Sequence, residues 1–459
     1  MAKNNHKGGE SLPLARTSLL ATLSSGGHPR NAPDSTPIEA PYALPEGWKW
    51  ERASNFADIF TGNSINENVK KEKYTGITEG LNFIGTKDVD FDGTINYENG
   101  VKISDYENFK TVPSNTPLLC IEGGSAGKKL GITSEQVCFG NKLCAFVCKN
   151  VEPKLVYYYL QTNAFFYSFM KERHGLIGGV SVGTLKNIPF PLPPTLAEQQ
   201  RIVNRIETMF AKLDQAQEKA QSVLDSFETR KAALLHKAFT GELTANWRKE
   251  NGVSDDSWEE KTIGDILFNI EAGKNVKCES RPPENDEFGI VKVSSVTWGK
   301  FDELESKVCF DDSCFNENVL IKIGDFLFSR ANTLQLVGNC VIVGDISKRL
   351  LLSDKILRFH FSNNIDSKFF LYFTRSMNYR SQVEDLASGN QDGMRNISQN
   401  NYKQVRFLMP ILPEQQEIVR ILDTVLEKES RAKEATQSVL DQIAMLKKSI
   451  LARAFRGEL

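Results

Sequence analysis

The sequence has little that would support metal binding, redox chemistry or membrane insertion. Its eight cysteines form no C-x-x-C pair, and its five histidines do not cluster near them. Cys144 and Cys148 fall on one face of a predicted strand, which favours buried free thiols over zinc ligands. The run SLPLARTSLLATL is interrupted by Pro13 and Arg16, which argues against a secretory signal and a membrane span. Reduced thiols without an export signal predict a cytoplasmic protein without metal sites.

Recognisable catalytic motifs are also missing. EGGSAGKKLG (122–131) resembles a phosphate-binding loop, but it has Glu122 where the motif needs its first glycine and Lys129 where it needs Ser or Thr. There is no Ser/His/Asp arrangement, no D/N-P-P-Y/F adenine-methylation motif, no glycine-rich cofactor motif and no helicase motif. PLPP (191–194) abuts a predicted helix, so we interpret it as a stiff hinge rather than a polyproline ligand. These absences together favour a binding protein over an enzyme.

An overall positive charge is absent as well, since the formal net charge is −2. The charges are unevenly distributed, however. Residues 45–109 hold 7 basic and 12 acidic residues, and 110–190 hold 9 and 4. Residues 248–344 hold 11 and 18, and 345–406 hold 10 and 6. A single basic patch is often only a solvated face, but its recurrence in two corresponding regions predicts a nucleic-acid-binding surface.

The 459 residues suggest several domains. Residues 1–43 are poor in large apolar groups and predict a disordered extension. Two strand-rich regions follow, at 44–194 and 244–412, and each contains one predicted helix, at 154–173 and 367–383. Each region stops at a proline-rich run, IPFPLPP (188–194) and FLMPILP (407–413).

Long helices are predicted after each proline-rich run, at 195–243 and 413–459. Apolar residues in the first recur at alternating steps of four and three, which is typical of a coiled coil. An amphipathic helix packed on its own domain is the alternative, although a helix of about 42 residues, or ~63 Å, is long for that role. The predicted coiled-coil core comprises Ile202, Ile206, Met209, Leu213, Val223, Phe227 and Arg230 in the first helix and Ile418, Leu422, Val425, Glu429, Val439, Ile443 and Leu446 in the second.

The two charged positions in this core predict the relative direction of the helices. In a parallel, in-register pair, Arg230 would face Leu446 and Glu429 would face Leu213, which would leave two unpaired charges. Reversing one helix pairs Arg230 with Glu429 and Leu213 with Leu446. We therefore expect an antiparallel pair.

The helices also show that the chain is a tandem duplication. Residues 198–243 align without a gap to 414–459, with 21 identities in 46 positions, ending in KAFTGEL and RAFRGEL. The strand-rich regions share only scattered matches. Similar connectors joining dissimilar globular parts predict a two-headed reader of two different things.

These motifs resemble the specificity subunit of type I restriction–modification enzymes. The resemblance rests on LPEGW (44–48), PLPPTLAEQQRIV (191–203), MPILPEQQEIV (409–419), the paired AFTGEL and AFRGEL, and GDFLFSRAN with LLSDKILRF in the second region. It covers residues 44–459. It implies an α+β fold and a pseudo-twofold tandem repeat, in which two strand-rich target recognition domains are each followed by a long helix of an antiparallel coiled coil.

The resemblance implies that each recognition domain reads one half of a bipartite asymmetric sequence in double-stranded DNA. Two modification subunits would dock and methylate adenine N6, and ATP-dependent restriction subunits could join through them. S-adenosylmethionine, ATP and Mg would belong to these partners, with no cofactor and no catalysis in this chain. A two-headed coiled-coil adaptor that binds proteins is the competing interpretation.

Candidate DNA-contacting residues follow from the chemistry of base edges and phosphates. Arg and Lys suit guanine, Asn and Gln suit adenine, and Lys also grips phosphate. Any one of these side chains could equally be a solvated loop residue. The candidates are Ser125, Lys128, Lys129, Asn141 and Arg173 in the first region and Arg330, Asn332, Gln335, Lys355, Gln391 and Arg395 in the second.

Overall fold

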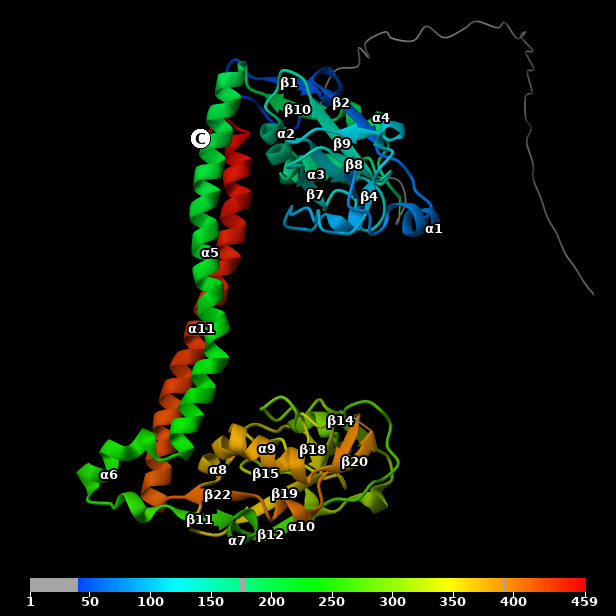
Figure 1. The fold of residues 1–459 in the computed structure, drawn as a ribbon. Coiled ribbons are helices and arrows are strands. Elements are labelled where there is room, and N and C mark those ends of the chain that lie inside the picture. The colour runs from blue at the N-terminus through cyan, green and yellow to red at the C-terminus, as the bar shows by residue number, and fades with distance from the viewer. Residues whose placement is uncertain (1–39, 174–177, 392) are drawn as a thin grey trace, which may run out of the picture. The chain divides into compact units, whose positions relative to one another are not determined.

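The computed structural model describes residues 40–173, 178–391 and 393–459, so most of the predicted N-terminal extension lies outside the described residues. The chain forms two compact units. The first runs to Val203 and includes Ala452–Glu458, and the second comprises Asn204–Leu451. We call residues 44–194 the first head, 244–412 the second head, and the paired long helices α5 (Leu196–Phe239) and α11 (Leu412–Ala454) the rod (Figure 1).

The first head is a mixed α/β domain built around a four-stranded antiparallel sheet of order β2-β9-β6-β7. A second sheet has the order β4-β3-β8-β5, in which β3 and β8 are parallel. The strands are β1 (Lys49–Arg52), β2 (Ala57–Thr61), β3 (Leu81–Ile84), β4 (Lys102–Ile103), β5 (Thr111–Val112), β6 (Pro117–Cys120), β7 (Leu130–Ile132), β8 (Val137–Phe139), β9 (Leu143–Cys148) and β10 (Pro189–Leu192), and the helices are α1 (Glu67–Val69), α2 (Pro153–Leu160), α3 (Asn163–Lys171) and α4 (Val182–Asn187).

The second head repeats this topology with a different sequence. Its four-stranded sheet has the order β12-β19-β15-β17, and its second sheet, β14-β13-β18, again contains one parallel pair, β13 with β18. The strands are β11 (Glu259–Thr262), β12 (Leu267–Ala272), β13 (Phe288–Val291), β14 (Ser306–Cys309), β15 (Phe326–Ser329), β16 (Ala331–Asn332), β17 (Cys340–Ile342), β18 (Arg349–Leu351), β19 (Ile356–Phe361), β20 (Ser388–Gln391), β21 (Met394–Asn396) and β22 (Arg406–Met409), and the helices are α6 (Ala245–Asn251), α7 (Ile263–Ile266), α8 (Ser367–Phe373), α9 (Met377–Leu386) and α10 (Gln399–Tyr402).

Two details of the predicted elements were wrong. The single helices expected at 154–173 and 367–383 are helix pairs, α2–α3 and α8–α9. Thr162 and Ser376 interrupt them, because each side chain accepts a hydrogen bond from the backbone N–H three residues ahead and caps a new helix. The proline-rich run at 188–194 is not only a hinge, since β10 pairs with β1 in a two-stranded ribbon, as β22 pairs with β11. An edge strand tolerates proline, which cannot donate to a ladder.

The repeated AF-x-GEL ends of the long helices pack against the heads. In the first unit, the rings of Phe455 and Tyr159 lie 5.1 Å apart in an edge-on contact, and Tyr42 Oη donates to the Phe455 carbonyl. In the second unit, Phe239 packs against Phe369 and Phe373 of α8. The C-terminal end of α11 is therefore part of the first unit's core, and the C-terminal end of α5 is part of the second's.

The rod is antiparallel, which confirms the prediction made from its charges. Arg230 Nε and Nη2 donate to the two carboxylate oxygens of Glu429 at 3.1 and 2.9 Å. Lys447 Nζ lies 2.5 Å from Asp214 Oδ1. Paired residue numbers thus rise along one helix and fall along the other. The Arg230–Glu429 pair is partly exposed, at 46% and 28%, so it is not the buried pair that the prediction assumed.

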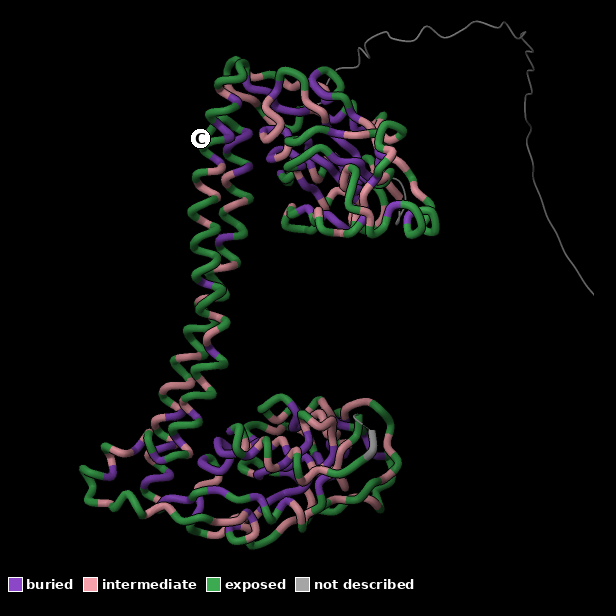
Figure 2. Tube along the Cα trace, viewed as in Figure 1, coloured by how far each residue is buried: buried purple, intermediate pink, exposed green. Residues whose placement is uncertain are grey.

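The predicted core of the rod is partly wrong in register. Ile202, Ile206, Phe227, Ile418, Leu422 and Ile443 are buried, and Met209, Leu213 and Val425 are half-buried. Val223, Val439 and Leu446, however, are 43%, 44% and 50% exposed. Leu224 and Leu440 are half-buried in place of the two valines, because a spacing of three or four accepts either member of an adjacent apolar pair. Lys447, the neighbour of Leu446, forms an ion pair with Asp214 of α5. Figure 2 shows the resulting exposure along the middle of both helices.

Candidate nucleic-acid interface

Three segments that are distant in sequence meet where the central strands β6 and β9 of the first head's main sheet end and begin. They are the loop 121–129 after β6, the turn 140–142 before β9, and the segment after α3, of which 174–177 lie outside the described residues. Ile121 N donates to the carbonyl of Lys142 at 3.0 Å, and Val180 N donates to the carbonyl of Ile121 at 3.0 Å. Backbone hydrogen bonds therefore align the three segments without depending on the identity of the side chains that make them up.

The second head builds the same arrangement. Arg330 N donates to the carbonyl of Lys355 at 3.0 Å, and Ile397 N donates to the carbonyl of Arg330 at 2.9 Å. The loop 330–339 thus takes the place of 121–129, the turn before β19 takes the place of 140–142, and the hairpin β20–β21 takes the place of the segment after α3. The two heads thus share this three-segment frame of backbone hydrogen bonds, and they differ in the side chains that the three segments carry.

A glycine closes the first loop in each head. Gly127 has φ +73° and Gly338 has φ +86°, and the N–H of each donates a 2.8 Å hydrogen bond back to the strand end, at Cys120 or Ser329. A Cβ atom would lie 2.7 Å from Phe169 at Gly127 and 2.7 Å from Val383 at Gly338. Only glycine allows both the left-handed conformation and the close approach to α3 or α9.

All the predicted DNA-contacting residues lie on these three segments. The loop after the strand carries Ser125, Lys128 and Lys129 in one head and Arg330, Asn332 and Gln335 in the other. The turn carries Asn141 in the first head and Lys355 in the second. The third segment carries Arg173 in the first head, and Gln391 and Arg395 in the second. The predicted positions therefore come together as two equivalent surfaces. The side chain of Gln391 lies outside what the structure describes.

Some of these side chains hold the surface of the first head together. Arg173 donates to the carbonyls of Gly178 and Gly123 at 3.0 and 3.2 Å, so it ties the third segment to the first loop. Lys129 Nζ donates to the Thr86 carbonyl at 3.1 Å. Lys128 and Asn141 are exposed on the same surface. Lys128 and Asn141 can thus face a ligand, whereas Arg173 and Lys129 position the loop.

The second head divides its roles in a similar way. Asn332 donates to Thr297 Oγ1 at 3.3 Å, while its Oδ1 accepts from Thr333 N at 2.9 Å. Arg395 contacts the carbonyl of Gly389 within the β20–β21 hairpin. Arg330 and Lys355 are half-buried, and Gln335 is exposed.

Lys142 is also exposed on this surface and is not among the residues predicted from the sequence. It occupies the same position in its turn as the candidate Lys355, because both carbonyls accept the equivalent backbone hydrogen bond. Its position directly before a strand, like that of Lys355, was the available signal.

The described residues show no grouped metal ligands, and two of the buried thiols are far from reactive. Across 40–173, 178–391 and 393–459, no three His, Cys, Asp or Glu side chains are grouped to hold a metal ion. Burial raises the pKa of Cys144 and Cys340 to about 12, which makes both thiols unreactive near neutral pH. No helix in the same part of the chain has the length and apolar character needed to cross a membrane. The surfaces offer donors, acceptors and cations, which suit recognition of base edges and phosphates.

Comparisons with known proteins agree with this architecture. Residues 45–224 and 255–440 each match the model of the type I restriction modification DNA specificity domain. The EcoKI specificity subunit of Escherichia coli K12 is 27% identical over 62% of this chain, and the match spans about three fifths (61%) of that relative. The StySPI specificity subunit of Salmonella potsdam is 24% identical over 91% of this chain and 90% of its own length. A solved structure from a study of assembly and conformational transition in a type I R–M system has a TM-score of 0.69 at 15% identity, covering 91% of this chain and 100% of the other.

Proposed function

Since the chain belongs to the type I restriction–modification DNA specificity family, we propose that it is the recognition subunit of such a complex and that each head reads one half of a bipartite, asymmetric DNA target. The observation that carries the proposal is the shared three-segment frame. Equivalent backbone bonds present Lys128 and Asn141 in one head and Gln335 and Lys355 in the other. Different donors and acceptors on one frame suit different bases in the major groove.

The rod fixes the distance between the half-sites in this proposal. A helix of 44 residues is about 66 Å long at ~1.5 Å per residue. Ion pairs such as Arg230–Glu429 and Lys447–Asp214 hold its two helices in one register. A fixed register gives a fixed spacer between the two half-sites.

Two modification subunits, adenine-N6 methyltransferases, dock on the chain, and ATP-dependent restriction subunits join through them. Exposed apolar side chains on the rod support the docking, namely Val223, Val439, Met445 and Leu446. The chain itself is non-catalytic and works in the cytoplasm with its eight thiols reduced. S-adenosylmethionine, ATP and Mg act in the partners.

Methylome sequencing of a host that expresses the chain with its modification subunit tests the proposal. The expected result is N6-methyladenine in one split, asymmetric motif. Unmodified DNA in cells where both proteins are present and assembled would overturn it and would favour the protein-binding adaptor. Methylation of DNA by the purified chain with S-adenosylmethionine alone would overturn the non-catalytic role.

A further inference from the structure

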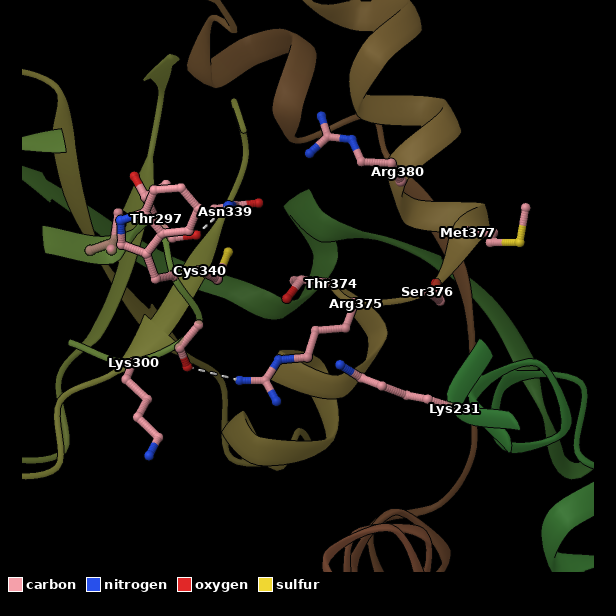
Figure 3. Close-up of a pocket in the computed structure, with 13 residues that line it drawn as sticks. Lys231, Thr297, Lys300, Asn339, Cys340, Thr374, Arg375, Ser376, Met377 and Arg380 are labelled. Carbon is pink, nitrogen blue, oxygen red and sulfur yellow. Dashed lines mark hydrogen bonds between the residues drawn. The ribbon is translucent and has the colours of Figure 1, made fainter. Parts of the chain in front are cut away.

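A pocket in the second unit borders the candidate interface and is lined by elements from both the rod and the second head. Its volume is about 560 Å³. Lys231 enters from α5, Trp298 and Lys300 from the loop after β13, and Arg375 and Arg380 from the start of α9 and the residues before it. Figure 3 shows Arg375 between Lys231 and Lys300, with its guanidinium bonded to the Gly299 carbonyl at 3.2 Å.

The pocket is cationic and lacks acidic groups of its own. Its lining contains four cations and no carboxylate. Within the described ranges, no Asp or Glu oxygen lies within 4.0 Å of a charged nitrogen of Lys231, Lys300 or Arg375, while Arg380 pairs with Glu384 at 3.0 Å. Burial lowers the pKa of Arg375, in contrast to Arg281, whose pKa the Glu287 carboxylate raises. Three cations gathered without a paired carboxylate favour an anionic ligand.

Hydrogen bonds join the pocket to the loop 330–339, which is part of the candidate interface of the second head. Asn339 Nδ2 donates to the Thr297 carbonyl at 2.9 Å, and Asn332 Nδ2 donates to the Thr297 hydroxyl at 3.3 Å. Arg380 donates to the carbonyls of Leu334 and Gln335 at 3.4 Å. The loop 330–339 and the lining of the pocket are therefore held next to each other.

The duplication provides an internal comparison for the rod residue. Lys231 and Lys447 occupy the same position in the two repeats. Lys447 is engaged within the rod, where Nζ lies 2.5 Å from Asp214 Oδ1 and 3.3 Å from Gln217 Oε1. Lys231 has no such ion pair and lines the pocket instead. The same lysine thus stabilises the rod in one repeat and contributes to a cationic site in the other.

We propose that this pocket binds the phosphodiester backbone of duplex DNA next to the half-site read by the second head. Helix α5 then contacts DNA through Lys231 in addition to spacing the heads. The inference rests on the proposed DNA-recognition function. Phosphate contacts set position and orientation without carrying sequence information, so the pocket anchors the head while the loop reads bases. Trp298, 77% exposed at the rim, offers an aromatic face to the sugar–phosphate backbone.

The test compares Lys231→Gln/Lys300→Gln with the control Lys447→Gln, each in the full chain bound to its modification subunit. Fluorescence anisotropy measures the Kd for a random-sequence duplex and for the methylome-defined target between about 50 and 200 mM salt. Each lost phosphate contact reduces the salt slope by about 0.9 and the affinity at 0.15 M salt by roughly fivefold. The double variant should therefore lose about 1.8 in slope and bind both duplexes roughly thirtyfold more weakly. The control should keep the wild-type slope.

Three other results would overturn the inference. One is an unchanged slope in a double variant with normal unfolding and assembly. Another is a weakened target Kd with an unchanged random-duplex Kd, because it would mean that the pocket reads sequence. The third is a double variant that no longer binds the modification subunit but still binds DNA normally. That result would mean that the pocket holds an acidic segment of the modification subunit. The methylome separates failure of the pocket inference from failure of the proposed recognition function. If the recognition function is wrong, a host with the wild-type protein and its modification subunit shows no modified split motif.

Discussion

The buried ion pair between Arg248 and Glu414 fastens the second head to the start of α11, and its removal should be costly. Arg248 Nη1 lies 2.6 Å from Glu414 Oε1, and Thr244 Oγ1 donates to the same oxygen at 2.6 Å. The two charged side chains are 7% and 0% exposed. Substituting Arg248→Met leaves a carboxylate buried without its cation, which should reduce the free energy of unfolding by about 3–5 kcal/mol.

The partly exposed Arg230–Glu429 pair is the matched comparison. Because water already solvates it, Arg230→Met should cost about 0–1 kcal/mol. The double variant Arg248→Met/Glu414→Leu removes both buried charges and should recover most of the lost stability. Urea unfolding can be followed by the fluorescence of Trp247 and Trp258, which lie close in sequence to the network. If Arg248→Met costs no more than Arg230→Met, the burial argument is refuted.

Three further predictions follow from the rod and the loops. Arg230→Glu should lower the stability of the rod by about 1 kcal/mol, and adding Glu429→Arg should restore it in thermal unfolding; no restoration would mean that the two side chains do not pair. Gly127→Ala or Gly338→Ala should destabilise its head by about 1–3 kcal/mol, since each has a left-handed φ and a side-chain atom 2.7 Å from the added Cβ. Gly344→Ala, with open space and no such φ, is the control and should be near neutral in the same urea assay. Adding seven residues after Ala220 and seven after Thr436 should lengthen the rod by ~10.5 Å, or about three base pairs at ~3.4 Å each. Three more base pairs also rotate one half-site about the DNA axis by about a third of a turn relative to the other. The methylome should therefore show a spacer longer by about three base pairs, or only weak modification if the heads cannot follow this rotation. Strong modification at the original spacer would contradict the role of the rod.

The duplication and the direction of the helices could be predicted because both depend on pairwise patterns in the sequence. The 21 identities expose the repeat, and the opposite charges of Arg230 and Glu429 meet when the helices run antiparallel. The exact face of the rod could not be predicted. Val223 and Leu224 are adjacent and both apolar, and a spacing of three or four fits either of them.

The candidate residues of the interface could be proposed from the sequence one by one, but their arrangement as a surface could not be predicted. Ile121, Lys142 and Val180 are joined by backbone hydrogen bonds, which leave no mark in side-chain identity. The pocket was missed for a related reason. Lys231 and Arg375 belong to different elements that are far apart in sequence. Lys231 and Lys447 occupy the same position in the two repeats, so the sequence does not show that one lines a pocket and the other forms an ion pair in the rod.

Exchanging the second head tests the central claim most directly. Residues 248–406 would be replaced by the corresponding residues of another member of the family, and the methylome of a host carrying the modification subunit would be sequenced. Independent reading by each head predicts that one half of the split motif changes while the other half and the spacer stay as they are. A change in both halves, or in neither with the exchanged protein assembled and active, would contradict it.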